Sequence, residues 1–191
     1  MAEKITFYLV RHGEADSNAL GLLSSFPEVE KNVRHLTEKG KGQIEEVAKH
    51  LSGEKVDVII SSPLTRTKET AAIIAAALEA PVLYDIRLRE TDFGMYNSLS
   101  TKDFFTKYPD PRLRVETSGG DGLESFSNIR GRAESFLEDV KREFPGGSIV
   151  VVSHGDTLEQ LRGAIEGKDL SSTTRGWMPP KGSCTKVEWN S

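Results

Sequence analysis

Ile5-Thr6-Phe7-Tyr8-Leu9-Val10 is a short, mostly apolar run that leads straight into Arg11-His12-Gly13-Glu14. A run of this length that is rich in β-formers predicts a strand buried on both faces, as strands of parallel sheets are. It is too short for the apolar region of a signal peptide. The polar residues that follow it therefore lie at the carboxyl end of a strand, where open α/β sheets bind their ligands.

Three more segments predict strands. Residues 56–60 and 149–152 are similar apolar runs and predict two further buried strands, and the alternation over residues 184–189 predicts a last strand at an edge. Helical spacing predicts four helices between them, one starting at Thr37 and Glu38, one over 64–78 with Pro63 in its first turn, one over about 123–144, and one from near Asp156. This alternation predicts a three-layer α/β/α fold, with helices on both faces of a mostly parallel sheet.

Length and composition limit the class of protein. With 191 residues we expect one domain spanning residues 1–191, with a lid-like excursion at about residues 92–122. The net charge of −4 and the lack of a basic stripe argue against a nucleic-acid partner, and no apolar stretch is long enough for a membrane span. The single cysteine, Cys184, excludes an internal disulfide and favours a cytoplasmic protein. Oligomeric state is left open.

Two of the predicted strands end in the same pattern. Val10 is followed by Arg11-His12-Gly13, and Val152 is followed by Ser153-His154-Gly155, so two of the four histidines precede a glycine at a strand end. A lone histidine of this kind is more often structural, but two in matching positions favour a site. The glycines allow close approach of the backbone to a ligand, and the next helix directs its first N–H groups at an anion.

Two arginines are predicted at the same edge of the sheet. Arg66 falls in the first turns of a helix, where the helix dipole disfavours a cation unless an anion is bound there. Arg11 stands beside His12. Either guanidinium alone is more often in an ordinary ion pair, but each is also a bidentate fork for phosphate oxygens. Together with the two histidines they predict an anion site.

Six motifs extend this pattern over nearly the whole chain: residues 9–14 with Asn18, 36–40 with Gln43, 61–70, 88–90, 119–120 with 124–125, and 152–155. In this order they resemble the histidine phosphatase superfamily, which has the phosphoglycerate mutase-like fold. The resemblance implies phosphoryl transfer through a phosphohistidine intermediate on a small phosphorylated metabolite.

The resemblance also implies roles for individual residues. His12 matches the nucleophile, Arg11 and Arg66 the phosphate-binding pair, His154 the second histidine, and Glu90 the proton donor. Asn18 matches a further phosphate contact by its spacing from His12, and Ser24 and Gly155 complete the set expected around the phosphate. Without the resemblance, Glu90 is more simply interpreted as a surface residue that follows Arg87 and Arg89.

The chain departs from its apparent relatives in two places. Residues 93–98, Phe-Gly-Met-Tyr-Asn-Ser, replace the Gly-x-Trp-Glu-Gly pattern of many small phosphatases of the family. The insertion after the acid residue is shorter than in phosphoglycerate mutases, which leaves a phosphohistidine more open to water. We therefore expect a phosphomonoester phosphatase without a cofactor. A mutase dependent on 2,3-bisphosphoglycerate is the alternative, and a non-catalytic phosphate-binding module of the same fold is a lesser one.

Two further hypotheses concern charged residues. Lys102, Lys107, Arg112 and Arg114 lie in the lid-like segment, and one or two of them, with Lys102 and Arg112 as the candidates, are predicted to bind a second anionic group of the substrate. A solvated surface is the simpler interpretation of such a run. A dinuclear metallophosphatase would need more His and carboxylate ligands, and His35 and His50 are poor candidates, so no metal is expected.

Overall fold

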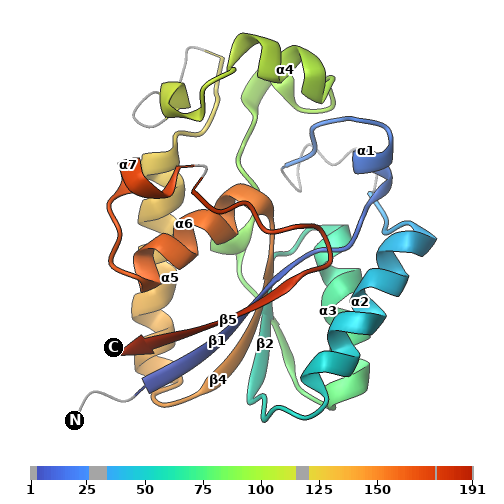
Figure 1. Cartoon of the computed structure of the whole chain (residues 1–191), viewed down its shortest axis with the longest axis vertical. Helices are drawn as coiled ribbons and strands as arrows, with labels where there is room; N and C mark the ends of the chain where they lie inside the picture. Colours follow the sequence, from blue (N-terminus) through green and yellow to red (C-terminus); the bar gives the residue numbers. More distant parts are fainter. Residues whose placement is uncertain (1–3, 26–33, 115–120, 175, 191) are drawn as a thin grey trace.

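The structure, a computed structural model, describes residues 4–25, 34–114, 121–174 and 176–190, with the backbone alone at 111 and 112. Five strands form one sheet in the order β3-β2-β4-β1-β5 (Figure 1). Their bounds are β1 Lys4–Arg11, β2 Val58–Ser61, β3 Val82–Tyr84, β4 Ser148–Ser153 and β5 Cys184–Asn190. All pair in parallel except β5, which runs antiparallel to β1. The prediction of a mostly parallel sheet with its last strand at an edge is confirmed.

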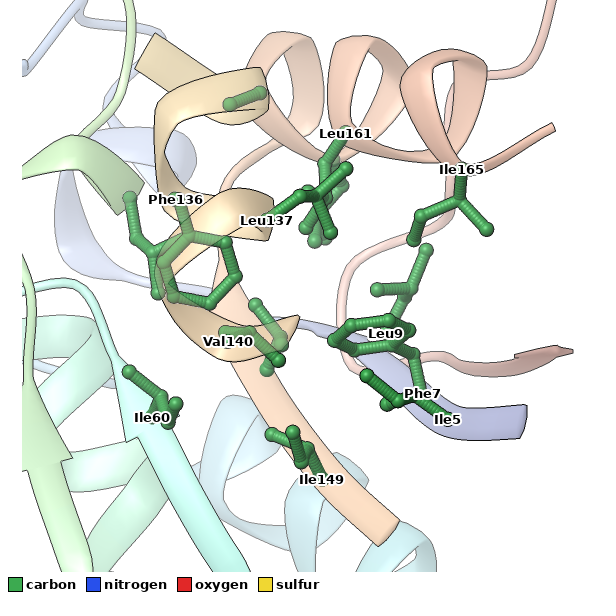
Figure 2. Packing of buried hydrophobic residues seen from close by; sticks show 14 of the residues in the cluster. Ile5, Phe7, Leu9, Ile60, Phe136, Leu137, Val140, Ile149, Leu161 and Ile165 are labelled. Atoms are coloured by element: carbon green, nitrogen blue, oxygen red, sulfur yellow. The ribbon is translucent and has the colours of Figure 1, made fainter. Parts of the chain in front are cut away.

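The side chains of β1 alternate between two cores. Ile5, Phe7 and Leu9 pack under α5 (Phe126–Glu143) and α6 (Gly155–Ile165), as Figure 2 shows. Tyr8 and Val10 point to the other face, which α2 (Glu38–Leu51) and α3 (Thr65–Leu78) cover. Each fully buried side chain of this size contributes roughly 1.5–3 kcal/mol. Helices on both faces confirm the three-layer α/β/α fold.

Capping residues decide where the helices begin. The Thr37 hydroxyl accepts a hydrogen bond from the Gly40 N–H and starts α2 as predicted. Ser125 caps α5 in the same way through the Asn128 N–H, so α5 begins three residues later than predicted. The expectation that Pro63 lies in the first turn of α3 is wrong, because the N-cap is Leu64 and Pro63 precedes it.

The excursion carries structure that the sequence did not predict. It contains η2 (Gly94–Tyr96), α4 (Thr101–Lys107) and the short η3 (Pro111–Arg114), while residues 115–120, with Gly119-Gly120, lie outside the described chain. Phe93 and Phe104 of the excursion form a small second core with Leu23 and Leu123 from the neighbouring chain. Three more short elements complete the chain. The helix α1 (Asp16–Ala19) follows β1, the 3₁₀ turn η1 (Ile86–Leu88) lies between β3 and the excursion, and α7 (Leu170–Thr173) follows α6.

Strand register brings the site together. Arg11 lies opposite Ser153, and Ser61 lies opposite Val152, so β1, β4 and β2 end at one edge of the sheet. The segments that follow these strands carry His12, His154 and Arg66. No helix in the described part of the chain is long and apolar enough to cross a membrane.

Candidate active site

A cleft of about 300 Å³ opens at this edge of the sheet. Seven of the predicted site residues line it: Arg11, His12, Asn18, Ser24, Arg66, Glu90 and Gly155. His154 lies directly behind, with its ring 5.1 Å from that of His12 between centroids. Segments far apart in the sequence thus converge on one small space.

The ring of His12 is fixed with one nitrogen directed at the cleft. Its Nδ1 lies 2.7 Å from the carbonyl oxygen of Gly13, an acceptor, so Nδ1 carries the proton. The other nitrogen, Nε2, then holds a lone pair and accepts from Nε of Arg66 at 3.2 Å. Burial, followed by the charge of Arg66, holds the pKa of His12 well below its usual value. A neutral imidazole with a directed lone pair is the form that a nucleophile needs.

Arg66 links the two histidines from the first turn of α3. Its guanidinium lies 3.2 Å from Nε2 of His12 and 3.1 Å from Nδ1 of His154. It also donates to the hydroxyl and the carbonyl of Ser24, at 3.3 and 2.8 Å. Ser24 therefore holds the fork in place, and the arginine reaches the position where an anion between the histidines would lie.

His154 is the N-cap of α6 and is fully buried. Its Nε2 lies 2.9 Å from the Ser62 hydroxyl, and its Nδ1 faces Arg66. Burial, then the charges of Arg66 and His12, hold its pKa well below the usual value. The ring is therefore neutral, and it can accept a proton and donate a hydrogen bond once an anion is bound beside it.

Arg11 and Gly155 form the next part of the wall. Arg11 donates through Nη1 to the carbonyl of Pro179 at 2.6 Å, which fixes the guanidinium against the start of α6. A Cβ on Gly155 would lie 3.2 Å from Cζ of Arg11 and 2.6 Å from Sδ of Met178. Glycine at this position therefore leaves the room that Arg11 occupies, and it leaves the first N–H groups of α6 open toward the cleft.

Asn18 lies on α1 and lines the cleft. Its Oδ1 accepts from the Ala15 N–H at 3.1 Å, so the donors of its amide group are what it can offer to an anion. Ser17, the neighbouring residue, is buried and also lines the cleft.

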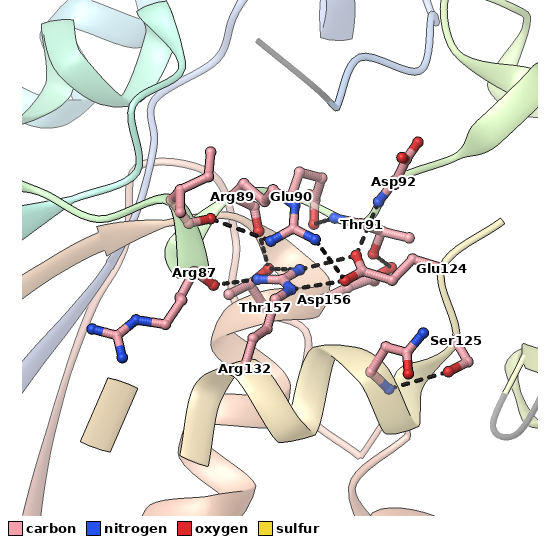
Figure 3. A network of polar contacts seen from close by, with 12 residues as sticks. Arg87, Arg89, Glu90, Thr91, Asp92, Glu124, Ser125, Arg132, Asp156 and Thr157 are labelled. Atoms are coloured by element: carbon pink, nitrogen blue, oxygen red, sulfur yellow. Dashed lines mark hydrogen bonds and ion pairs between the residues drawn. The ribbon is translucent and has the colours of Figure 1, made fainter. Parts of the chain in front are cut away.

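Glu90 lies in the cleft wall, 9% exposed, after η1. Burial, followed by the charge of Asp156, raises its pKa, as a proton donor requires. Its segment is pinned by Glu124, which accepts from Arg89 at 3.2 Å, from Arg132 at 3.0 Å and from the N–H of Asp92 at 3.1 Å (Figure 3). The interpretation of Glu90 as a surface residue is wrong.

Of the two lid residues proposed for a second anion, the structure describes the side chain of Lys102 alone, and it lies outside the cleft. Lys102 is on the exposed side of α4 and is not among the lining residues. The side chain of Arg112 lies outside what the structure describes. Arg114 from the same segment does line the cleft, and so does Lys181, which sequence reasoning missed. Lys181 follows Pro179-Pro180 in a loop without periodicity, so only the folded chain places it beside Arg11.

The remaining histidines are remote from this site. His35 bonds to Glu69 and His50 to the carbonyl of Glu46, both at exposed positions. Among the residues that the structure describes there is no group of three or more His, Cys, Asp or Glu side chains that could hold a metal ion.

The altered segment after Glu90 contributes one side chain to the cleft mouth. Phe93 lines the cleft, together with Leu22, Leu23 and Phe105 from neighbouring segments. Gly94 has a φ of +53°, and a Cβ there would lie 2.2 Å from the carbonyl oxygen of Asp121, so this position needs glycine. The mouth thus combines apolar side chains with the cations Arg114 and Lys181.

Comparison with known proteins gives a consistent assignment. The model of the histidine phosphatase superfamily (branch 1) matches residues 7–191. The chain is 36% identical over 174 residues to phosphoserine phosphatase 1 of Hydrogenobacter thermophilus, covering 87% of this chain and 79% of that protein. It is 33% identical to the probable phosphoglycerate mutase GpmB of Escherichia coli, over 84% of this chain and 74% of that one. A solved mycobacterial glucosyl-3-phosphoglycerate phosphatase superposes with a TM-score of 0.81 at 22% identity, over 97% and 91% of the two chains.

Proposed function

The chain belongs to the histidine phosphatase superfamily, and from this premise we propose that it hydrolyses phosphomonoesters of small metabolites through a phosphohistidine formed on His12. One observation carries the proposal. Nδ1 of His12 is bonded to the Gly13 carbonyl, which leaves the lone pair of Nε2 directed at the Arg66 fork, with Glu90 in the same cleft.

In the first step, Nε2 of His12 attacks phosphorus and the bond from phosphorus to the leaving oxygen breaks. Glu90 gives its proton to that oxygen and becomes a carboxylate. Arg11, Arg66 and the N–H groups at the start of α6 neutralise the charge on the non-bridging oxygens, which is most of what catalysis of phosphoryl transfer requires. Asn18 and His154 add hydrogen bonds to the same oxygens.

In the second step, the Glu90 carboxylate takes a proton from water as the water oxygen attacks phosphorus. The bond from phosphorus to Nε2 breaks, the lone pair returns to the imidazole, and inorganic phosphate leaves. Glu90 is then protonated again, so the cycle closes with His12 and Glu90 in their starting forms. No metal ion takes part in this scheme.

The substrate class follows from the charges at the mouth. Lys181 lines the cleft beyond Arg11, and burial, followed by the charge of Arg11, lowers its pKa. A substrate with a second anionic group, such as a carboxylate, would relieve this repulsion. Phosphoserine, the substrate named for the relative with 36% identity, has such a group and is small enough for the cleft.

A mutase dependent on 2,3-bisphosphoglycerate is the second candidate, because a relative of 33% identity is named as a probable phosphoglycerate mutase. The short excursion favours hydrolysis, since a more open phosphohistidine is reached by water more easily.

One experiment separates the candidates. Phosphoserine, 3-phosphoglycerate and a simple alkyl phosphate, which has no charged group besides its phosphate, are assayed for phosphate release. A mutase assay with and without 2,3-bisphosphoglycerate is run in parallel. The proposal predicts phosphate release that His12→Asn abolishes. Mutase turnover exceeding hydrolysis would replace it, and phosphate binding without turnover would contradict both enzyme assignments.

A further inference from the structure

A second buried carboxylate stands next to the proton donor. Asp156 is the second residue of α6, is 8% exposed and lines the cleft, yet the proposed scheme gives it no chemical step. Its Oδ2 accepts two hydrogen bonds, from the Thr91 hydroxyl at 2.7 Å and from Nη2 of Arg114 at 3.0 Å.

Thr91 connects this carboxylate to Glu90. It is fully buried, and its backbone N–H donates to Oε1 of Glu90 at 3.0 Å while its hydroxyl donates to Asp156. One residue therefore fixes both carboxyl groups, and a displacement of Asp156 is transmitted to Glu90 through the backbone of its neighbour.

Arg114 holds Asp156 from the far end of the excursion. It is buried, and its guanidinium lies over the rings of Phe126 at 4.5 Å and Phe104 at 5.4 Å. A planar cation fixed between rings and one carboxylate has little freedom to move toward a second partner. The ion pair thus ties the excursion to α6 directly beside Glu90.

The charges around Glu90 act in opposite directions. Asp156 opposes its ionisation, whereas three guanidinium groups favour it, those of Arg11 on β1, Arg66 on α3 and Arg132 on α5. Both histidines of the cleft are neutral, and Arg114 faces Asp156. Although burial opposes the ionised form of Asp156, the charge of Arg114 and the Thr91 hydroxyl hold its pKa below the usual value. Of the two neighbouring carboxyl groups, Asp156 is the one that is ionised.

We propose that Asp156 is a positioning residue for the proton donor: anchored by Arg114, it fixes Thr91 and, through Thr91, the carboxyl group of Glu90. Its negative charge also opposes the ionisation of Glu90 at the start of each cycle. The same charge makes the Glu90 carboxylate a stronger base after it has given up its proton, when it must take one from water. The inference rests on the proposed function, in which Asp156, Thr91 and Arg114 have no role of their own.

Asp156→Asn tests it, because asparagine keeps the shape and removes the charge. Two substrates are compared, p-nitrophenyl phosphate, whose leaving group needs little protonation, and phosphoserine, whose alkoxide needs a proton. We expect kcat/KM for phosphoserine to fall by roughly tenfold or more, part of the ~10²–10⁴-fold that general acid catalysis supplies. For p-nitrophenyl phosphate the loss is expected to stay within about threefold, as no proton is required there. The alkaline limb of the pH profile moves to lower pH.

Three variants control the comparison. Glu90→Gln removes the proton donor and so shows the largest expected difference between the losses in kcat/KM for the two substrates. Asp103→Asn, a change of the same kind at an exposed position on α4, should leave kcat/KM unchanged for both. Thr91→Val, which loses the bond to Asp156, reproduces the selective loss on phosphoserine, and Thr91→Ser restores it. The Thr91 pair also answers the question if Asp156→Asn does not fold.

The outcomes are distinct. Equal losses on both substrates with an unchanged pH profile would show that Asp156 is merely structural and would overturn the inference. If the wild-type protein hydrolyses neither substrate, the proposed function itself fails. A selective loss on phosphoserine with a shifted alkaline limb supports both.

Discussion

His12 owes its nucleophilic form to a single carbonyl group. The Gly13 carbonyl oxygen accepts a hydrogen bond from the Nδ1–H group, and the buried surroundings keep the ring neutral, so Nε2 retains its lone pair. Nε of Arg66 lies 3.2 Å from Nε2 of His12, and the guanidinium can donate its hydrogen bonds to a phosphate once one is bound. The reactivity of His12 therefore depends on which ring nitrogen carries the proton, and the backbone turn at Gly13 determines that it is Nδ1.

His12→Asn is expected to reduce phosphate release by about 10³-fold or more, because asparagine has no ring nitrogen with which to form the covalent intermediate. Rapid acid-free quenching of the wild-type protein should show an acid-labile phosphoprotein that the variant lacks. His50→Asn, a change at an exposed histidine on α2, serves as the matched control. A phosphoprotein that persists in His12→Asn would place the nucleophile elsewhere.

The pH profile is set by two groups with opposite requirements. His12 acts when neutral, and burial with the charge of Arg66 lowers its pKa, so the acid limb moves to lower pH. Glu90 acts when protonated, and burial with the charge of Asp156 raises its pKa, so the alkaline limb moves to higher pH. We expect a bell-shaped kcat/KM with its maximum below neutrality.

The measurement is kcat/KM for phosphoserine over the range from about pH 4 to 9, which spans the ordinary pKa values of Glu and His. Glu90→Gln should lose the alkaline limb and keep the acid limb. A flat wild-type profile would contradict the assignment of both groups.

Lys181 gives the test of the substrate class. Lys181→Ala is expected to raise KM for phosphoserine by roughly tenfold, which corresponds to the loss of one charge-assisted contact of about 1.5 kcal/mol. KM for the simple alkyl phosphate, which has no second charged group, should not change. Lys102→Ala, which removes an exposed lysine on α4, should leave KM unchanged for both substrates. If Lys102→Ala raised KM for phosphoserine and Lys181→Ala did not, the second anionic group would bind to the lid segment instead.

At the scale of elements, α2 packs unusually closely against the turn that follows β1. A Cβ on Gly40 would lie 2.0 Å from the carbonyl oxygen of Glu14, and one on Gly13 would lie 2.4 Å from the oxygen of Gly40. Thr37 strengthens the contact, since its N–H donates to the Glu14 carbonyl at 2.9 Å. The turn that directs the ring of His12 is thus held by the start of a helix.

Gly40→Ala is expected to destabilise the protein by about 1–3 kcal/mol, because backbone atoms must separate to admit a methyl group. Phosphate release should fall as well, since Gly13 moves with the turn. Gly42→Ala, on the same helix with nothing within 4 Å of its Cβ, should instead stabilise by about 0.5–1 kcal/mol. Urea unfolding of the two variants measures both values, and equal shifts of the same sign would show that the close contact does not matter.

At the scale of the whole molecule, the cleft joins β1, α3, the segment after η1, and the start of α6. A bound anion bridges these elements, and it binds only when they are folded together. Binding therefore adds to the free energy of unfolding by mass action.

Vanadate, which resembles a five-coordinate phosphoryl group, should raise the free energy of unfolding by about 2.7 kcal/mol at a hundred times its Kd. In a chain of this size that corresponds to a rise in Tm of several degrees, about 2–4 °C per kcal/mol. Thermal unfolding followed by circular dichroism measures it. Arg66→Ala should lose the shift, whereas Arg142→Ala, at an exposed position on α5, should keep it. An unchanged shift in Arg66→Ala would remove this arginine from the anion site.

Much of this molecule follows from local patterns in the chain. Apolar runs predicted β1, β2 and β4, since a strand buried on both faces must be apolar throughout, and alternation predicted β5 at the edge. Helical spacing with Thr37 as a cap predicted the start of α2, because capping acts over three residues. β3 escaped prediction because it is three residues long and two of its three side chains are exposed. The fold class and family were therefore open to sequence reasoning.

The paired His-Gly motifs and Arg66 could also be predicted, because parallel strands bring their carboxyl ends to one edge. The burial of Glu90, the Thr91 bridge to Asp156 and the arrival of Lys181 and Arg114 could not. Each of these depends on contacts between residues tens of positions apart, which no local period records. Composition and periodicity determined the layers, and the resemblance to a known family supplied the expected nucleophile. The protonation of Glu90 and the charge of the cleft mouth were decided only by the tertiary structure, since both depend on distances through a buried, low-dielectric space.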